Sequence, residues 1–145
     1  MEKIWKRIVR EAEDNLVPGD NFYLQPLKDN LYNWHFTFKG NENSVYDKGL
    51  YHGALLLTEK YPFSPPDILF FNKSGRFHIN NKICLSITSY HKEQWSPMWS
   101  LKKIMVAVSA FFHDEERGIG YIKLPDEQRR ELAMLSRSYK CNECG

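Results

Sequence analysis

Cys84 is the residue of this chain whose setting best fits covalent chemistry. It lies in the run KICLSI, within a stretch from residue 72 to 97 that has neither helical nor strand periodicity. Long irregular segments of compact domains are usually functional, although a free cysteine is most often a buried structural residue. No serine–histidine–aspartate or phosphate-loop pattern competes with it as a reactive centre. These observations favour Cys84 as a nucleophile.

The other two cysteines, Cys141 and Cys144, form a C-x2-C pair in the final residues CNECG. A structural zinc site needs four ligands, and the sequence offers no second pair. The nearest preceding histidine, His113, is far away along the chain. We therefore expect no metal site and an exposed tail. The odd number of cysteines indicates free thiols in a reducing compartment, the cytosol or nucleus.

The composition is typical of one globular domain. The 145 residues are 42% hydrophobic and 14% aromatic, and the net charge is only +2. So small a net charge gives no indication of nucleic-acid or membrane-surface binding. No run approaches the roughly 18 apolar residues of a membrane span, and the amphipathic N-terminus lacks the apolar region of a signal peptide.

Hydrophobic periodicity predicts an α+β domain. Helices are expected over residues 2–14, 101–112 and 125–139, and strands over 24–27, 31–39, 51–58 and 67–71. Strands gathered between helices in this way indicate a four-stranded antiparallel meander. We expect Ile4, Trp5 and Ile8 of the first helix to be core residues. The large aromatic residues Trp34, Tyr61, Trp95 and Trp99 are also expected in the core.

Three segments in this order, YPFSPPDI, ICLSI and QWSPMWSLKKIM, resemble the signatures of the ubiquitin-conjugating enzyme family. Other runs resemble its J-type branch: QPLKDNLYNWHFTFKG, GLYHGALLL, GRF before KICLSIT, and DEQRRELAMLSRSYKCNECG. That branch is tail-anchored in the endoplasmic reticulum membrane and acts in the disposal of misfolded proteins. The resemblance covers nearly the whole chain. It implies the family's fold: an N-terminal helix, a four-stranded antiparallel meander, an active-site segment and C-terminal helices.

The resemblance also implies an activity. Cys84 would accept ubiquitin as a thioester from the activating enzyme and transfer it to a substrate with a RING-type ligase. No metal or organic cofactor is implied, because the activating enzyme consumes ATP upstream. Two alternatives are an inactive variant that only binds ubiquitin, against which the presence of Cys84 argues, and a carrier of a ubiquitin-like modifier, which the sequence leaves open.

The same resemblance implies endoplasmic-reticulum-associated degradation as the setting. The protein would act at the cytosolic face of that membrane if a C-terminal anchor follows residue 145. Residues 1–139 would form the catalytic core, and residues 140–145 would begin a linker. This piece carries no membrane segment of its own.

The chain departs from the family where most members carry His-Pro-Asn before the cysteine. Here that slot reads Asn72-Lys73-Ser74. A hydrogen-bond donor for the oxyanion or for loop support could come from Asn72, Ser74, Asn80 or Asn81. We favour Asn80 and Asn81, although asparagine is also an ordinary turn former.

Two further residues have candidate catalytic roles. His91 lies in the insertion SITSYHKEQ after the cysteine and could act as a general base, or it could be an idle loop histidine. Asp114, between His113 and Glu115, occupies the region where the family places an acidic gate for the incoming lysine. The alternative for Asp114 is a solvated cluster at a helix end.

Two groups of residues match the family's partner-binding surfaces. Phe63 in YPFSPP, together with Ser96, Pro97 and Met98, matches the ligase-binding loops. An exposed aromatic on a proline-stiffened loop is a plausible anchor, and the alternative for Phe63 is a core position. Lys3, Lys6 and Arg7 lie on the polar face of the first helix, where the family meets the activating enzyme.

Overall fold

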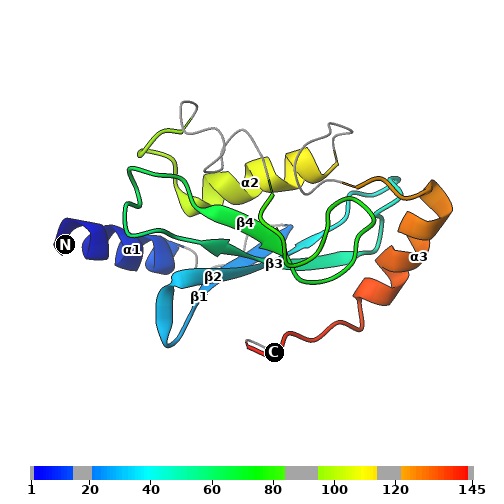
Figure 1. The fold of residues 1–145 in the computed structure, drawn as a ribbon, viewed down its shortest axis with the longest axis horizontal. Helices are drawn as coiled ribbons and strands as arrows, with labels where there is room; N and C mark the ends of the chain where they lie inside the picture. The colour runs from blue at the N-terminus through cyan, green and yellow to red at the C-terminus, as the bar shows by residue number, and fades with distance from the viewer. Residues whose placement is uncertain (1, 15–20, 84–94, 114–121, 144–145) are drawn as a thin grey trace.

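The computed structural model describes residues 2–14, 21–83, 95–113 and 122–143 (Figure 1). Its elements are, in order, α1 (Glu2–Asp14), β1 (Phe22–Leu27), β2 (Asn30–Lys39), β3 (Leu50–Leu56), β4 (Asp67–Phe70), α2 (Leu101–Phe112) and α3 (Asp126–Ser136). The four strands form one sheet in the order β1-β2-β3-β4, and each neighbouring pair is antiparallel. The predicted α+β class and meander are confirmed. The bounds of the first two helices are as predicted, and α3 is shorter at both ends.

The alternation along β2 sorts its side chains between two faces of the sheet. Trp34, Phe36 and Phe38 are at most 1% exposed and lie in the core. The ring of Phe38 meets that of Phe112 edge-on at a centroid distance of 5.0 Å, which packs α2 against this face. Figure 1 shows α2 lying across that side of the sheet. The expected core positions of Trp34 and Tyr61 are confirmed, while Trp95 and Trp99 are partly buried at the margin of the core.

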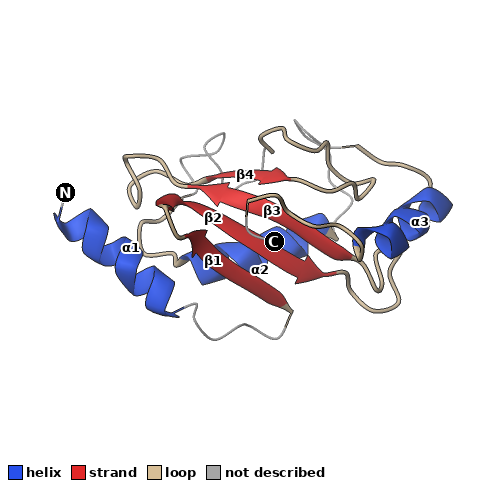
Figure 2. Ribbon diagram, turned by 90° about the horizontal axis from the view of Figure 1, so that it is seen from below, coloured by secondary structure: helices blue, strands red, loops and turns tan. Residues whose placement is uncertain are grey.

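The opposite face of the sheet carries His35, Thr37 and His52, and the chain after α3 returns across it. Both histidines are buried, and the Tyr139 ring lies 5.8 Å from that of His52. Figure 2 shows the C-terminal segment passing over the face of the sheet that is turned away from α2. Burial lowers the pKa of both imidazoles, that of His52 to about 4, so both rings are neutral at pH 7.

The first helix corrects one expectation. Ile8 is fully buried as predicted, but Trp5 is 50% exposed and is not a core residue. Among the described side chains of α1, Ile8 and Glu11 are buried and Ala12 packs against the core, and these three share one stripe of the helix. Trp5 lies one turn nearer the N-terminus than Ile8, and the N-terminal end of α1 projects beyond the sheet (Figure 1). The side chain of Ile4 lies outside the described part of the chain.

Candidate functional site

The candidate nucleophile Cys84 and the neighbouring His91 lie outside the described residues, but the backbone that leads into Cys84 is well defined. The N–H of Ile83 donates a 2.9 Å hydrogen bond to the carbonyl of Ile68 in β4, and the Ile83 side chain is 1% exposed. Just before it, the N–H of Asn80 donates to the carbonyl of Phe70 at 2.7 Å. Residues 80–83 are therefore held along β4, and the residue before Cys84 is fixed in the core.

The only cation immediately before Cys84 in the sequence is Lys82, and it is already paired. Its Nζ lies 3.2 Å from Oδ2 of Asp67, the first residue of β4. Because this carboxylate offsets the lysine charge, Lys82 is a weak source of thiolate activation.

Two of the four candidate donors before the cysteine are committed to the fold. Oδ1 of Asn72 accepts from the N–H of His52 at 2.9 Å, and its Nδ2 donates to the carbonyl of Leu50 at 2.9 Å. The fully buried Ser74 accepts from the N–H of Arg76 at 3.1 Å. Asn72 therefore holds the loop against β3, and Ser74 supports the backbone within the loop.

Asn80 and Asn81 remain as candidates because both are exposed. The backbone of Asn80 has φ of +60°, the left-handed region in which asparagine is enriched among non-glycine residues. Asn80 thus forms a turn, which is the alternative role that the sequence indicated for an asparagine here. A further role of either amide toward Cys84 stays a prediction.

Arg76, in the GRF run before the cysteine, is a structural residue. Its Nε donates to the carbonyl of Phe112 and its Nη2 to that of Phe111, both at 3.1 Å. A cation at this position donates to carbonyls at the C-terminal end of α2 and interacts favourably with the helix dipole. The segment before the cysteine is thereby fastened to α2.

His113 ends α2 and is likewise structural. Its Nδ1 donates to the carbonyl of Ser109 at 2.8 Å, and its Nε2 accepts from the N–H of Asn41 at 2.9 Å. This pair of bonds fixes a neutral tautomer, and burial lowers the pKa of the ring. The adjoining Asp114, predicted as an acceptor gate, lies outside the described residues.

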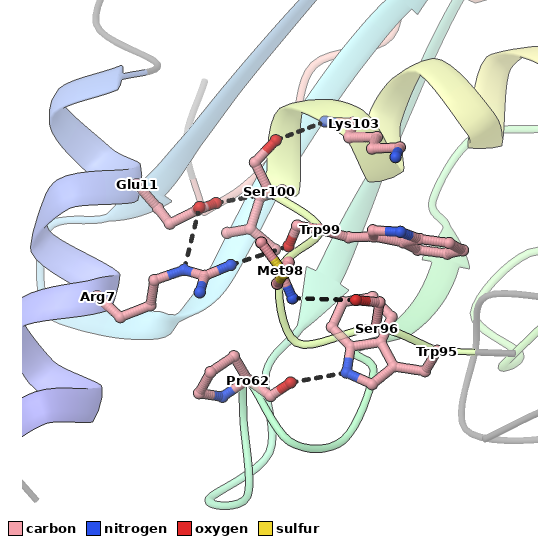
Figure 3. Close-up of polar contacts among 10 residues, drawn as sticks. Arg7, Glu11, Pro62, Trp95, Ser96, Met98, Trp99, Ser100 and Lys103 are labelled. Atoms are coloured by element: carbon pink, nitrogen blue, oxygen red, sulfur yellow. Dashed lines mark hydrogen bonds and ion pairs between the residues drawn. The ribbon is translucent and has the colours of Figure 1, made fainter. Parts of the chain in front are cut away.

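The two predicted ligase-binding loops lie side by side and are joined by one hydrogen bond. Nε1 of Trp95 donates to the carbonyl of Pro62 at 2.7 Å (Figure 3). Beside this bond the side chains of Phe63 and Met98 are 72% and 89% exposed. The exposure of Phe63 rules out its alternative as a core residue. An aromatic and a thioether that face solvent on loops of fixed spacing form a surface suited to a protein partner.

The second loop is also fastened to α1 (Figure 3). Nη2 of Arg7 donates to the carbonyl of Trp99 at 3.0 Å, and its Nε lies 3.4 Å from Oε1 of Glu11. The other oxygen of Glu11 accepts from the N–H of Leu101 at the start of α2. Arg7 therefore holds the loop in position, in addition to lying on the polar face of α1. Lys6 is exposed as expected, and the side chain of Lys3 lies outside the described part.

The sequence of this domain matches the model of a known protein family. Residues 7–119 match the family model for the ubiquitin-conjugating enzyme. The chain belongs to the ubiquitin-conjugating enzyme family. The matched range contains Cys84 and both loops, so the candidate nucleophile and the candidate docking surface fall within the family's own domain.

Comparison with curated relatives places this ubiquitin-conjugating enzyme in the J-type branch. It is 41% identical over 141 residues to ubiquitin-conjugating enzyme E2 J1 of Homo sapiens, covering 97% of this chain and 44% of that protein. It is 40% identical over 134 residues to ubiquitin-conjugating enzyme E2 32 of Arabidopsis thaliana, covering 91% and 43%. It is 34% identical over 119 residues to ubiquitin-conjugating enzyme E2 J2 of Homo sapiens, covering 82% and 46%.

The chain thus spans less than half the length of these curated relatives. Among the described helices, none combines the length and the apolar character that crossing a bilayer requires.

Proposed function

We propose that this ubiquitin-conjugating enzyme carries ubiquitin as a thioester on Cys84 and transfers it to substrates. The observation that supports this most strongly is the family match across residues 7–119, which includes a cysteine directly after a residue fixed in the core. A nucleophile must be presented at a constant place to two successive partners. The hydrogen bond that anchors Ile83 on β4 would keep Cys84 at such a constant position.

The chemistry is two acyl transfers. The Cys84 thiolate attacks the carbonyl carbon of the ubiquitin thioester on the activating enzyme, and that enzyme's thiolate leaves. A substrate amine then attacks the new thioester, an isopeptide bond forms, the amine loses a proton and the Cys84 thiolate leaves. Asn80 or Asn81 would support the loop or the oxyanion, His91 would be a base, and Asp114 would hold the incoming ammonium. The transfer needs no organic cofactor or metal, and ATP is consumed by the activating enzyme.

A RING-type ligase would dock on the exposed surface of Phe63, Ser96, Pro97 and Met98. Two features support this proposal: the high exposure of Phe63 and Met98, and the bond from Trp95 to Pro62 that fixes the loops relative to each other. The activating enzyme would approach the neighbouring face of α1 through Lys3, Lys6 and Arg7. Because Arg7 also bonds to Trp99, the two partners would share one continuous surface.

The setting that we propose is degradation associated with the endoplasmic reticulum, at the cytosolic face of its membrane if an anchor follows in the full-length protein. Its support is the likeness to the J-type branch. The substrates would then be misfolded proteins marked for disposal.

The activity is tested by incubating the protein with activating enzyme, ATP and ubiquitin, followed by electrophoresis without reductant. We expect an adduct that a thiol reductant removes. A parallel reaction with ubiquitin-like modifiers and their own activating enzymes tests whether the protein carries such a modifier instead of ubiquitin. No adduct in any reaction would support the inactive binding module, and an adduct with another modifier alone would overturn the choice of ubiquitin.

A further inference from the structure

Two buried histidines meet on the outer face of the sheet, the face opposite α2. The register of β2 and β3 pairs His35 with Ala54 and Thr37 with His52. His35 and His52 are therefore diagonal neighbours on one face. Nδ1 of His35 lies 3.2 Å from Nε2 of His52, and the two residues are 5% and 9% exposed.

The C-terminal segment brings a cysteine to this pair. Sγ of Cys141 lies 3.6 Å from Nδ1 of His35, the same nitrogen that faces His52. The three ligand atoms lie within 4.8 Å of one another, two of these residues are buried and the cysteine is partly buried. Figure 2 shows the segment crossing the sheet to reach this position. The mutual distances of such atoms are a direct test of whether one ion could bind all three.

We propose that His35, His52 and Cys141 bind a zinc ion. In a tetrahedral zinc site, bond lengths of about 2.05 Å to nitrogen and 2.3 Å to sulfur place two nitrogens about 3.3 Å apart and nitrogen and sulfur about 3.6 Å apart. The observed 3.2 Å and 3.6 Å match these separations. Binding would displace the proton of the Cys141 thiol, which passes to solvent, and form one Zn–S and two Zn–N bonds.

The groups behind the two imidazoles also suit a metal site. Nδ1 of His52 lies 2.8 Å from Oγ1 of Thr37, and Nε2 of His35 lies 3.8 Å from Oε2 of Glu143. Metal-bound histidines usually donate their second ring N–H to an oxygen of this kind, which orients the ring and fixes its tautomer. Nε2 of His35 is buried and has no hydrogen bond among the described residues, so metal binding at Nδ1 would direct a proton toward Glu143.

Cys144 follows Cys141 at the C-x2-C spacing that is common in zinc sites. It lies outside the described residues, and the proposal stands on the three ligands above. The sequence predicted no metal site because only ligands close to Cys141 along the chain were considered, and His35 and His52 are remote from it there. The sheet register and the path of the tail bring them together.

The ion would fasten the residues after α3 to the sheet. The described contacts of this segment include the bond from Arg137 to the carbonyl of Lys48 at 2.9 Å and the Tyr139 ring beside that of His52, and the ion would add to these. A zinc site would fix where any following part of the protein leaves the domain, on the face opposite α2.

The test uses the 145-residue chain with Cys84→Ser, so that the candidate nucleophile does not bind metal. Chelator-treated protein is titrated with zinc chloride against a chromophoric chelator, and with cobalt chloride while the visible and near-ultraviolet absorption is recorded. We expect one zinc per chain, a tetrahedral cobalt spectrum with a thiolate band, and a melting temperature raised by zinc. Cys141→Ser should weaken zinc binding at least about tenfold, as should His52→Gln, while His78→Gln, an exposed control, should not.

A second measurement does not depend on variants of buried residues. In the nitrogen-15 spectrum of the histidine side chains, zinc should shift Nδ1 of His35 and Nε2 of His52, and leave His78 unchanged. Unchanged imidazole nitrogens would overturn the proposal, because the two histidines would then be a hydrogen-bonded pair only. Zinc affinity that survives His52→Gln would also overturn it, since the metal would then be held by the tail cysteines without the sheet.

Discussion

The indole nitrogen of Trp95 donates a 2.7 Å hydrogen bond to the carbonyl oxygen of Pro62, and this bond joins the two loops that carry Phe63 and Met98. The Trp95 ring also meets that of Trp99 edge-on at a centroid distance of 5.7 Å. A partner that contacts both loops therefore meets a surface whose spacing is set in advance. Preorganised surfaces bind more tightly because less ordering is needed on association.

Changing Trp95 to Phe should weaken this link while keeping an aromatic ring. We expect a loss of about 1 kcal/mol in the free energy of unfolding, because the Pro62 carbonyl loses its donor. Ligase-stimulated discharge of ubiquitin should slow several-fold. Trp34→Phe is the matched control, since Nε1 of Trp34 donates a 2.8 Å hydrogen bond to the carbonyl of Leu31 within β2 and does not join the two loops. Equal slowing by both variants would show that general stability, rather than loop spacing, controls discharge.

Changing Phe63 to Ala should separate ligase binding from charging. We expect ligase-stimulated discharge to fall about tenfold, the scale of a lost interface anchor, while charging by the activating enzyme stays unchanged. The unfolding free energy should change by no more than about 0.5 kcal/mol, because the side chain is 72% exposed. Tyr23→Ala removes an exposed aromatic side chain at a different place, on β1, and should change neither charging nor ligase-stimulated discharge. Discharge at the parent rate in Phe63→Ala would remove this residue from the docking surface.

Changing Arg76 to Met should loosen the end of α2. The variant removes two hydrogen bonds from a charged donor to carbonyls at the helix end, and such bonds contribute about 1.5–3 kcal/mol each. We expect urea denaturation to show a loss of at least about 2 kcal/mol, and Arg76→Lys to show a smaller loss. Lys73→Met, at an exposed position of the same loop, should change the free energy of unfolding little. A loss as small as in Lys73→Met would mean that Arg76 does not secure the helix.

The partly buried His113 should make stability depend on pH. Because burial lowers the pKa of the folded state below the unfolded value of about 6.5, the unfolded chain binds the proton first. The stabilising contribution is thus complete above about pH 6.5 and is lost as the pH falls toward the folded pKa, by at most about 1.4 kcal/mol per pH unit. Urea midpoints at pH 7.5 and 5, with a chelator present, should show a smaller loss in His113→Gln than in the parent. His78→Gln serves as the exposed control, and a parent-like loss in His113→Gln would contradict this account.

Local patterns in the sequence were sufficient for the helices and the meander. The apolar spacing in residues 2–14 and 101–112 gave α1 and α2, and the alternation from Trp34 to Phe38 gave the face of β2 that meets α2. The same patterns could not place Trp5, because its exposure depends on how far α1 projects beyond the sheet. Propensity and periodicity describe one element at a time, whereas exposure depends on the whole assembly.

The grouping of His35, His52 and Cys141 on the outer face could not be predicted for a related reason. Nothing local links His35 to Cys141; their 3.6 Å separation depends on the β2–β3 register and on the return of the tail after α3. The C-x2-C pair was one indication of a metal site in the sequence. The histidines on the two neighbouring predicted strands would have strengthened it. Asn72 and Ser74 show the converse case, since only their bonding partners reveal that they serve the fold.

The most direct test of the central claim is to measure the intact mass of the protein after reaction with activating enzyme, ATP and ubiquitin, for the parent, Cys84→Ala and Cys84→Ser. The parent should gain one ubiquitin through a bond that hydroxylamine and thiols cleave, and Cys84→Ala should gain none. Cys84→Ser should gain one through a bond that resists thiols, because an alkoxide is a poorer leaving group than a thiolate. A thiol-sensitive adduct that persists in Cys84→Ala, mapped by proteolysis to another cysteine, would contradict the account.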